Sequence, residues 1–244
     1  MKAIRVSDCV LGAAALLISA PLGAATVSID PGTDIQSVVD QNPSGTTYLL
    51  KSGVHRLQSI TPKDGDTFTG ETGTVLSGAV VLTSFSREGS LFYAPHQTQR
   101  NPPSVGMCDS DHPLCLNTED LYFDGVALTR VGSKADVTSG TWYFDYGAQN
   151  IYFAGDPSGH TVETSITQYA FSGPAVNVTI QNLTVEKYAS PAQKGAVGGS
   201  QAAPAGWVVQ NNEIRWNHGL GVHAGDGGKV LNNYIHHNGQ MGIN

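Results

Sequence analysis

The stretch from Val208 to Asn244 carries four of the eight histidines in the chain. Imidazole titrates near neutral pH, so a histidine there can act as a general base or donate a hydrogen bond to a substrate. We single out His223, because Asp226 follows closely and could orient the ring or help to bind calcium. Arg215 could neutralise a carboxylate of the ligand, and His218 lies between these candidates. The alternative is that His223 is an ordinary exposed residue.

His236 and His237 are adjacent, which is typical of solvated turn residues and less typical of paired metal ligands. Their distances along the sequence to other ligand-type residues match no recognised metal motif, so the sequence predicts no metal site.

A second cluster, "MCDSDHPLC", holds Cys108 and Cys115 with six residues between them. A loop of that length can return on itself, so we expect a disulfide that closes a surface loop. The weaker alternative is a zinc site, which would recruit the neighbouring Asp109, Asp111 and His112.

Composition excludes some functions. Charged residues make up only 14% of the chain, glycine is frequent at 29 residues, and the formal net charge is -7. Many turns and few long exposed helices follow from such a composition. No run of Lys or Arg forms a basic stripe, so we expect no nucleic-acid partner.

The first residues have the pattern of an export signal. Lys2 and Arg5 give a positive start, an apolar segment follows from Val10 to Ala20, and small residues suit cleavage near Ala25. The apolar segment is too short to span a membrane, so we expect no membrane span. Residues 1–25 are therefore predicted to be a signal peptide of a secreted or periplasmic protein, where an oxidising environment favours the disulfide.

The elements that must position these side chains repeat along the chain. Val208–Asn244 superimposes on itself at an offset of 21 residues, and Val178–Tyr188 aligns with Trp207–Asn217 at an offset of 29. A weaker copy occupies Asp120–Val131. Short apolar pairs separated by Asn and Gly corners at this period indicate a solenoid.

These repeats resemble the right-handed parallel β-helix (pectin-lyase-like) family of secreted bacterial proteins. The resemblance implies an all-β solenoid in which each coil contributes short parallel strands. Asn182, Asn211 and Asn232 fall in one column and are expected to form an internal stack at a corner, since Asn tolerates the left-handed conformation. The chain stops inside a coil at Asn244, which predicts a C-terminally truncated sequence.

The expected β-helix also assigns the other residue ranges to structural elements. Thr33 and Gln36 are spaced as a capping box and start a short helix that caps the first coil. Residues 26–118 would form this cap, the first coils and the disulfide loop. Residues 119–176 would form a coil with an inserted aromatic β-hairpin at Ser139–Pro157, and residues 177–244 the regular, incomplete coils.

The hairpin is a possible binding element. Its aromatic rings could stack on sugar rings, with Trp142, Tyr143 and Tyr152 as candidates. The alternative is that the hairpin is a hydrophobic plug or flap.

The resemblance also implies a substrate groove along the strand after the Asn-Gly turn, here Gly219–Gly225. Alternation would point Leu220 and Val222 inward and Gly221 and His223 outward, so that Gly221 leaves room for a ligand. The predicted catalytic residues are His223, His218, Asp226 and Arg215, and the predicted substrate-binding residues are Trp142, Tyr143, Tyr152, His236 and Asn244.

Known catalytic motifs of the family are missing. The chain lacks the Trp-Ile-Asp-His run of pectate lyases and the Gly-His-Gly motif of polygalacturonases, so no catalytic residue carries over. The function expected from the resemblance is that of a carbohydrate-active protein, acting on a polysaccharide as a lyase, hydrolase or epimerase. The alternative is a non-catalytic glycan-binding or surface β-helix.

Overall fold

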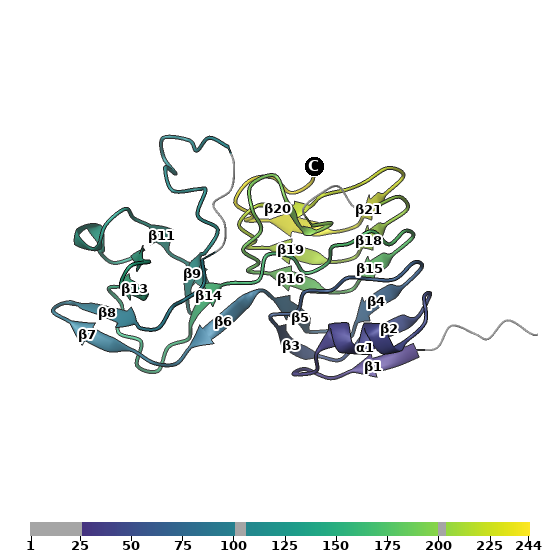
Figure 1. Ribbon diagram of the computed structural model, residues 1–244, viewed down its shortest axis with the longest axis horizontal. Helices are drawn as coiled ribbons and strands as arrows, with labels where there is room; N and C mark the ends of the chain where they lie inside the picture. The colour runs from purple at the N-terminus through teal and green to yellow at the C-terminus, as the bar shows by residue number, and fades with distance from the viewer. Residues whose placement is uncertain (1–25, 101–105, 200–203) are drawn as a thin grey trace, which may run out of the picture.

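The computed structural model describes residues 26–100, 106–199 and 204–244. The predicted signal peptide, residues 1–25, lies outside the described residues. Within them the chain forms a stack of parallel coils and, beside it, a lobe of mostly antiparallel strands (Figure 1). No helix in these ranges is long and apolar enough to cross a membrane.

The stack is a parallel β-helix, as predicted. Sheet A consists of β1 (Thr26–Ile29), β2 (Thr47–Leu50), β4 (Thr67–Gly70), β15 (Thr179–Gln181), β18 (Val208–Gln210) and β21 (Lys229–Leu231). Sheet B consists of β3 (Gly53–Arg56), β5 (Thr74–Ser77), β16 (Thr184–Glu186), β19 (Glu213–Arg215) and β22 (Tyr234–His236). The third face contains β17 (Gly195–Val197) and β20 (Leu220–Val222), and single bridges extend it to Ile60, Phe171 and Ile243.

The strand register agrees with the repeats in the sequence. Ile180 of β15 lies opposite Val209 of β18, an offset of 29 residues, and Val209 lies opposite Val230 of β21, an offset of 21. In the three-residue strands of sheets A and B the middle residue points into the coil, as at Val185, and its side chain stacks on the coil below. In β20 the two end residues, Leu220 and Val222, are the buried apolar ones.

A helix covers the first coils. Helix α1 (Ile35–Gln41) buries Ile35 and Val39 in the same core as the coil residues. Its N-cap is Asp34, whose carboxylate accepts from the backbone N–H groups of Gln36 and Ser37. The predicted capping box beginning at Thr33 is therefore wrong by one residue, because Asp34 supplies the capping oxygen.

At the corners between sheets A and B the expected left-handed conformation of asparagine is confirmed, but the expected internal stack is corrected. Asn182, Asn211 and Asn232 all have positive φ, as predicted. Asn182 and Asn211 are exposed, however, and the buried amide that links coils is that of the next residue, Asn212. Its Oδ1 accepts from Leu183 N–H at 3.0 Å. The left-handed residue turns its own side chain outward, so the following residue faces the core.

The lobe interrupts one coil. The chain leaves the β-helix after β5 and rejoins it before Phe171, so residues 79–165 form a separate unit. One sheet contains β6 (Ala79–Leu82), β14 (Val162–Ser165), β9 (Leu121–Phe123) and β10 (Val126–Ala127). The other contains β7 (Ser86–Glu88), β8 (Leu91–Ala94), β13 (Asn150–Phe153), β12 (Thr141–Asp145) and β11 (Thr129–Arg130), and the 3-10 turn η1 (Lys134–Asp136) lies beside it.

The expectation that residues 119–176 form a coil with an inserted hairpin is corrected, because most of these residues belong to the lobe. Strand β9, inside the apparent repeat copy at Asp120–Val131, pairs antiparallel with β14 and belongs to the lobe. The copy matched because a short strand, a turn and a second strand look alike in either setting. The hairpin itself is confirmed, since β12 and β13 pair antiparallel with Tyr143 opposite Tyr152.

The disulfide is confirmed. Cys108 and Cys115 are bonded, with 5.6 Å between their Cα atoms. The pairing uses both thiols, so the zinc alternative loses its sulfur ligands.

Candidate functional site

A row of ion pairs crosses the outer face of sheet B. Where Val185 and Ile214 point into the core, the next residues of the same strands, Glu186 and Arg215, point outward. Together with neighbouring side chains they form a continuous chain of contacts, here called the ion-pair ladder: Arg56, Glu163, Lys187, Glu186, Arg215, Glu213 and His236.

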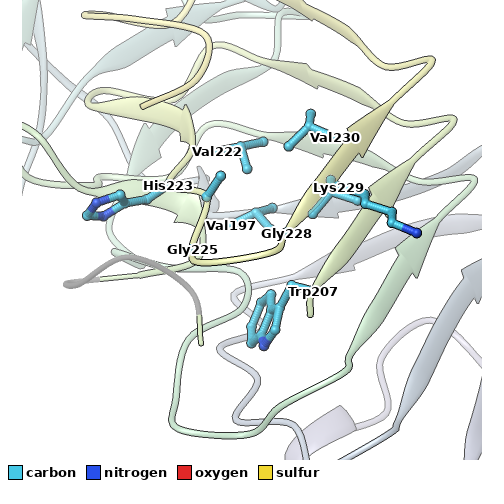
Figure 2. Close-up of a pocket in the computed structure, with 10 residues that line it drawn as sticks. Val197, Trp207, Val222, His223, Gly225, Gly228, Lys229 and Val230 are labelled. Atoms are coloured by element: carbon cyan, nitrogen blue, oxygen red, sulfur yellow. The ribbon is translucent and has the colours of Figure 1, made fainter. Parts of the chain in front are cut away.

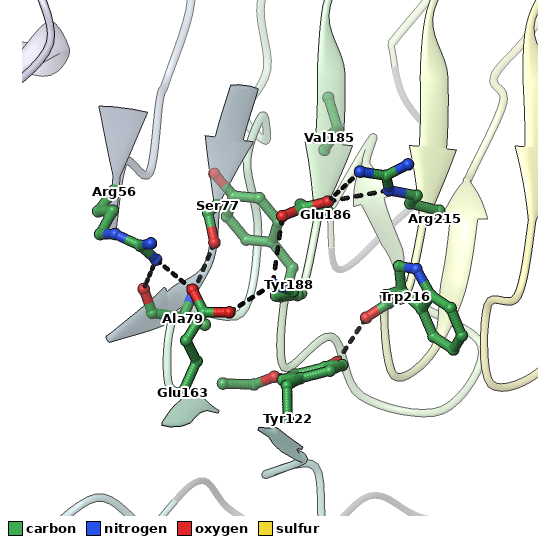
Figure 3. A network of polar contacts seen from close by, with 12 residues as sticks. Arg56, Ser77, Ala79, Tyr122, Glu163, Val185, Glu186, Tyr188, Arg215 and Trp216 are labelled. Atoms are coloured by element: carbon green, nitrogen blue, oxygen red, sulfur yellow. Dashed lines mark hydrogen bonds and ion pairs between the residues drawn. The ribbon is translucent and has the colours of Figure 1, made fainter. Parts of the chain in front are cut away.

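The end of the ladder next to the lobe is buried. Glu163 of β14 accepts from Arg56 at 2.7 Å through one oxygen (Figure 3). Its other oxygen accepts from Lys187. Burial alone would raise the pKa of Glu163, but the two cations hold the pKa below its ordinary value. Tyr122 of the lobe also donates its hydroxyl to the carbonyl of Trp216 at 2.8 Å. These contacts fix the lobe against sheet B.

The other end of the ladder is partly open to solvent. Arg215 donates to Glu186 at 2.9 Å and to Glu213 at 2.7 Å. His236 Nε2 lies 3.1 Å from the same Glu213 oxygen. Arg215 and His236 also occupy matching positions of adjacent coils, as the repeat predicted.

Aromatic rings flank this open end. Tyr234, which is 65% exposed, stacks on His236 with 4.1 Å between ring centroids. Trp216 stacks on His237 with 4.6 Å between ring centroids, and the two residues are separated by the 21-residue offset of the repeat. Trp216 and His237 both have positive φ, which places them at the same corner of successive coils.

A polar hollow lies at the other edge of sheet B, where each coil turns from sheet A. The volume of this corner hollow is about 440 Å³. It is lined by Gly70–Thr74, Asn182–Thr184, Asn211 and Glu213. Glu213 thus belongs both to the corner hollow and to the ladder. Ligand sites for small molecules start at roughly 300 Å³, so this hollow is large enough for a sugar unit.

The surroundings of His223 differ from those expected of a groove. Its backbone lines an apolar interior cavity of about 10 Å³, and its ring points away from that cavity (Figure 2). Such a space holds at most about one water molecule, so the cavity cannot take a substrate. The ring is partly exposed, but Nδ1 is buried without a hydrogen-bond partner in the described part of the chain.

Gly221 does not leave room for a ligand beside His223. A Cβ atom at Gly221 would lie 2.8 Å from both the carbonyl oxygen of Gly242 and Cγ2 of Ile235. The space that the sequence suggested for a ligand is therefore filled by the next coil. Gly221 is small because the coils approach closely there.

His218 connects the coils to the disulfide loop. Its Nδ1 lies 3.1 Å from Asp120 Oδ2, and its Nε2 lies 2.8 Å from the Cys115 carbonyl. Burial would lower the pKa of His218, but these two acceptors raise the pKa to about 9. A charged imidazolium donates through both nitrogens, so the geometry gives His218 a structural role rather than the predicted catalytic one.

The aromatic hairpin mostly faces the lobe interior. Trp142 is fully buried under the guanidinium of Arg130, 5.0 Å from its ring, and Tyr152 is also buried. Neither ring can stack on a sugar at the surface, because both are buried. Tyr143 is partly exposed and is the one predicted hairpin residue that solvent reaches.

The two remaining predicted residues lie apart from the ladder. Asp226 is exposed in a turn, where its carbonyl accepts from Gly206 N–H. Asn244 is exposed and pairs through its backbone with Val222 and Ala224. Among the described residues no group of three His, Cys, Asp or Glu side chains could hold a metal ion.

Of the predicted set, Arg215 and His236 come together in the ladder, and Tyr143 and Tyr152 lie side by side on the hairpin. Sequence reasoning missed Glu163, which meets Arg56 from 107 residues away. It also missed Glu213, although its position two residues before Arg215 on a strand predicts that the two side chains share a face.

Comparison with known proteins shows the fold. No family model matches the chain, and neither does any curated protein sequence. A solved structure described as the complex of XylC with xylose is similar, with a TM-score of 0.61, 16% identity and coverage of 75% of this chain. This chain spans 37% of the length of XylC. A structure described as a glycoside hydrolase matches with a TM-score of 0.41 and 11% identity, covering 83% of this chain and 62% of its own.

Proposed function

We propose that this chain belongs to an exported carbohydrate-active protein that binds a polysaccharide on the outer face of sheet B. The observation that carries the proposal is the corner hollow, which continues through Glu213 into the open end of the ladder. Export rests on the predicted signal peptide and is supported by the disulfide, since disulfides persist in oxidising compartments.

The chemistry of this face suits sugars. Sugar hydroxyls are both donors and acceptors, and the hollow offers the side-chain amides of Asn182 and Asn211, the hydroxyl of Thr184 and the carboxylate of Glu213. The exposed ring of Tyr234 and the partly exposed ring of Trp216 lie on adjacent coils, where the apolar faces of sugar rings can stack. The xylose in the XylC complex supports a sugar ligand for this fold.

Glu213 and His236 are the groups we assign to proton transfer. The carboxylate lies 3.1 Å from Nε2 and orients the ring, while the other nitrogen, Nδ1, lies 2.6 Å from Nδ1 of His237. A base role for His236 therefore requires the substrate to displace the His237 ring from Nδ1. A lyase, a hydrolase and an epimerase all need a proton-transfer step. Glu163 and Glu186 are unsuitable, because each side chain is largely buried, whereas that of Glu213 is 33% exposed.

The saturation of the ladder favours a second candidate function. Arg215 is neutralised by two carboxylates and holds them in place, which is typical of a scaffold. The second candidate is therefore a non-catalytic glycan-binding β-helix that uses the same face.

The test is depolymerisation and binding by the exported protein, with and without calcium. Xylan, pectic, alginate and glycosaminoglycan substrates would be screened for unsaturated ends, reducing ends and retention in affinity electrophoresis. We expect Glu213→Gln to weaken binding by about tenfold or more, because a hydrogen bond to a charged group contributes about 1.5–3 kcal/mol. Glu88→Gln is the control, since Glu88 forms an exposed ion pair on the lobe.

The results distinguish the enzyme from the non-catalytic binding protein. Cleavage by the parent protein that is lost in Glu213→Gln supports the enzyme. Retention of the parent protein without cleavage, weakened in Glu213→Gln, supports the binding protein. If His223→Ala loses binding or cleavage while Glu213→Gln keeps full activity, the site lies instead on the third face, as the sequence predicted. A folded protein that neither binds nor cleaves any of these polysaccharides would contradict the proposal.

A further inference from the structure

The basic side chains on the proposed binding face are already neutralised. Lys51 contacts Glu71 at 2.7 Å, Arg56 contacts Glu163 at 2.7 Å, and Lys187 contacts the same Glu163. Arg215 is shared between Glu186 and Glu213. None of these four cations is left for a carboxylate that arrives with a ligand.

The corner hollow itself carries negative charge. Its lining residues include Glu71 and Glu213 and no Lys or Arg. The hydrogen bonds from Lys51 and from the backbone of Ser52 lower the pKa of Glu71, so this carboxylate stays ionised at neutral pH. The other polar lining groups, such as Asn182, Asn211 and Thr72, are uncharged.

A polyuronate would meet this surface unfavourably. It carries one carboxylate on every sugar, and each would have to lose water beside Glu71 or Glu213 without a new cationic partner. To bind, it would have to displace Glu213 from Arg215, which would leave a partly buried carboxylate without its arginine partner. A chain of uncharged sugars needs only donors and acceptors, and the hollow supplies both.

We infer that the ligand of this face is a neutral polysaccharide, such as a pentose or hexose polymer without uronic acids. This inference rests on the proposed function and narrows its substrate class. It also replaces the role expected for Arg215 from the sequence, which was to neutralise a uronate carboxylate.

The test compares neutral and uronic polysaccharides of similar length by affinity electrophoresis and calorimetry, with and without calcium. Unsubstituted xylan, galactan and a mixed-linkage glucan would represent the neutral class, and polygalacturonate and alginate the uronic class. We expect at least about tenfold tighter binding of a neutral chain. That binding should change little between low and physiological salt, because it involves no net charge.

Two variants with the same change in charge make the test specific. Glu71→Gln leaves Lys51 unpaired at the hollow, whereas Glu88→Gln leaves Lys134 unpaired on the lobe. We expect Glu71→Gln to raise the affinity for polyuronate severalfold and Glu88→Gln to leave it unchanged. Both glutamates are exposed enough that neither change should impair folding.

The outcomes separate the two proposals. Polyuronate binding that equals or exceeds neutral binding, with or without calcium, overturns this inference and leaves the glycan-binding function standing. An equal effect of the two variants on polyuronate also overturns it, because the charge at the hollow would then not matter. Absence of binding to both classes overturns the proposed function and this inference with it.

Discussion

At the scale of single residues, Gly221 shows how the same pattern can be interpreted in two ways. A glycine beside a histidine on a β-helix strand predicts space for a ligand. In the structure the direction of the missing side chain is occupied by Gly242 and Ile235 of the next coil. The glycine permits coils to stack closely, and its neighbour His223 is left without the groove that the pattern suggested.

This gives a first prediction. Gly221→Ala should destabilise the protein by about 1–3 kcal/mol, because the added methyl group overlaps backbone of the next coil. Urea unfolding followed by circular dichroism measures the change. Gly132→Ala is the matched control, since a Cβ atom there meets nothing within 4 Å. If both variants unfold at the same urea concentration, Gly221 borders open space and the groove interpretation regains support.

At the scale of elements, the lobe and the coils are held together by charges that neither part could bury alone. Glu163 lies on lobe strand β14, and Lys187 follows strand β16 of the coils. Each is almost fully buried, so each depends on the other for its charge to be tolerated. The same contact brings the lobe beside the ladder, and thereby sets one border of the proposed binding face.

The second prediction tests this link. Glu163→Ala should lower the free energy of unfolding by about 3–5 kcal/mol, because it removes the main partner of a buried ammonium. Glu88→Ala, which breaks the exposed pair with Lys134, should cost no more than about 1 kcal/mol. Thermal unfolding of the two variants provides the comparison, and similar losses would argue against the buried link.

At the scale of the whole molecule, His218 joins three regions of the chain. It stands on the turn before β20, and its ring contacts Asp120 at the start of the lobe strand β9 and Cys115 of the disulfide loop. Arg130 also acts on His218 and opposes its protonation. The lobe, the loop and the coils thus share one charged hydrogen-bond centre.

The third prediction is a dependence on pH. The pKa of His218 is raised to about 9 in the folded state, above the ordinary 6.5 of the unfolded chain. The stabilisation is therefore fully present below about pH 6.5 and is lost as the pH rises through about 9. It amounts to at most about 3 kcal/mol. His218→Gln should be less stable than the parent protein at pH 6, and the difference should shrink towards pH 10.

The control for this effect is an exposed histidine. His160 forms a surface pair with Asp124, so His160→Gln should show little loss at either pH. A difference between His218→Gln and the parent that stays constant from pH 6 to pH 10 would contradict the charged hydrogen-bond centre.

The sequence by itself determined the fold of the coils. Offsets of 21 and 29 residues fixed which strands pair, since identical apolar positions must stack for each coil to cover the next. The same offset of 21 residues places Arg215 beside His236 and Trp216 beside His237 on successive coils. The disulfide followed from two cysteines at loop spacing behind a predicted export signal.

Only the tertiary structure decided where the candidate site lies. The repeat fixes contacts between neighbouring coils, but it carries no information on an insertion whose strands pair antiparallel with one another. Glu163 therefore had no sequence signal to connect it with Arg56, and Trp142 gave no sign that Arg130 would cover it. The burial of His218 and the occupation of Arg215 by two carboxylates also depend on how the lobe and successive coils pack, and these contacts moved the candidate site from the third face to sheet B.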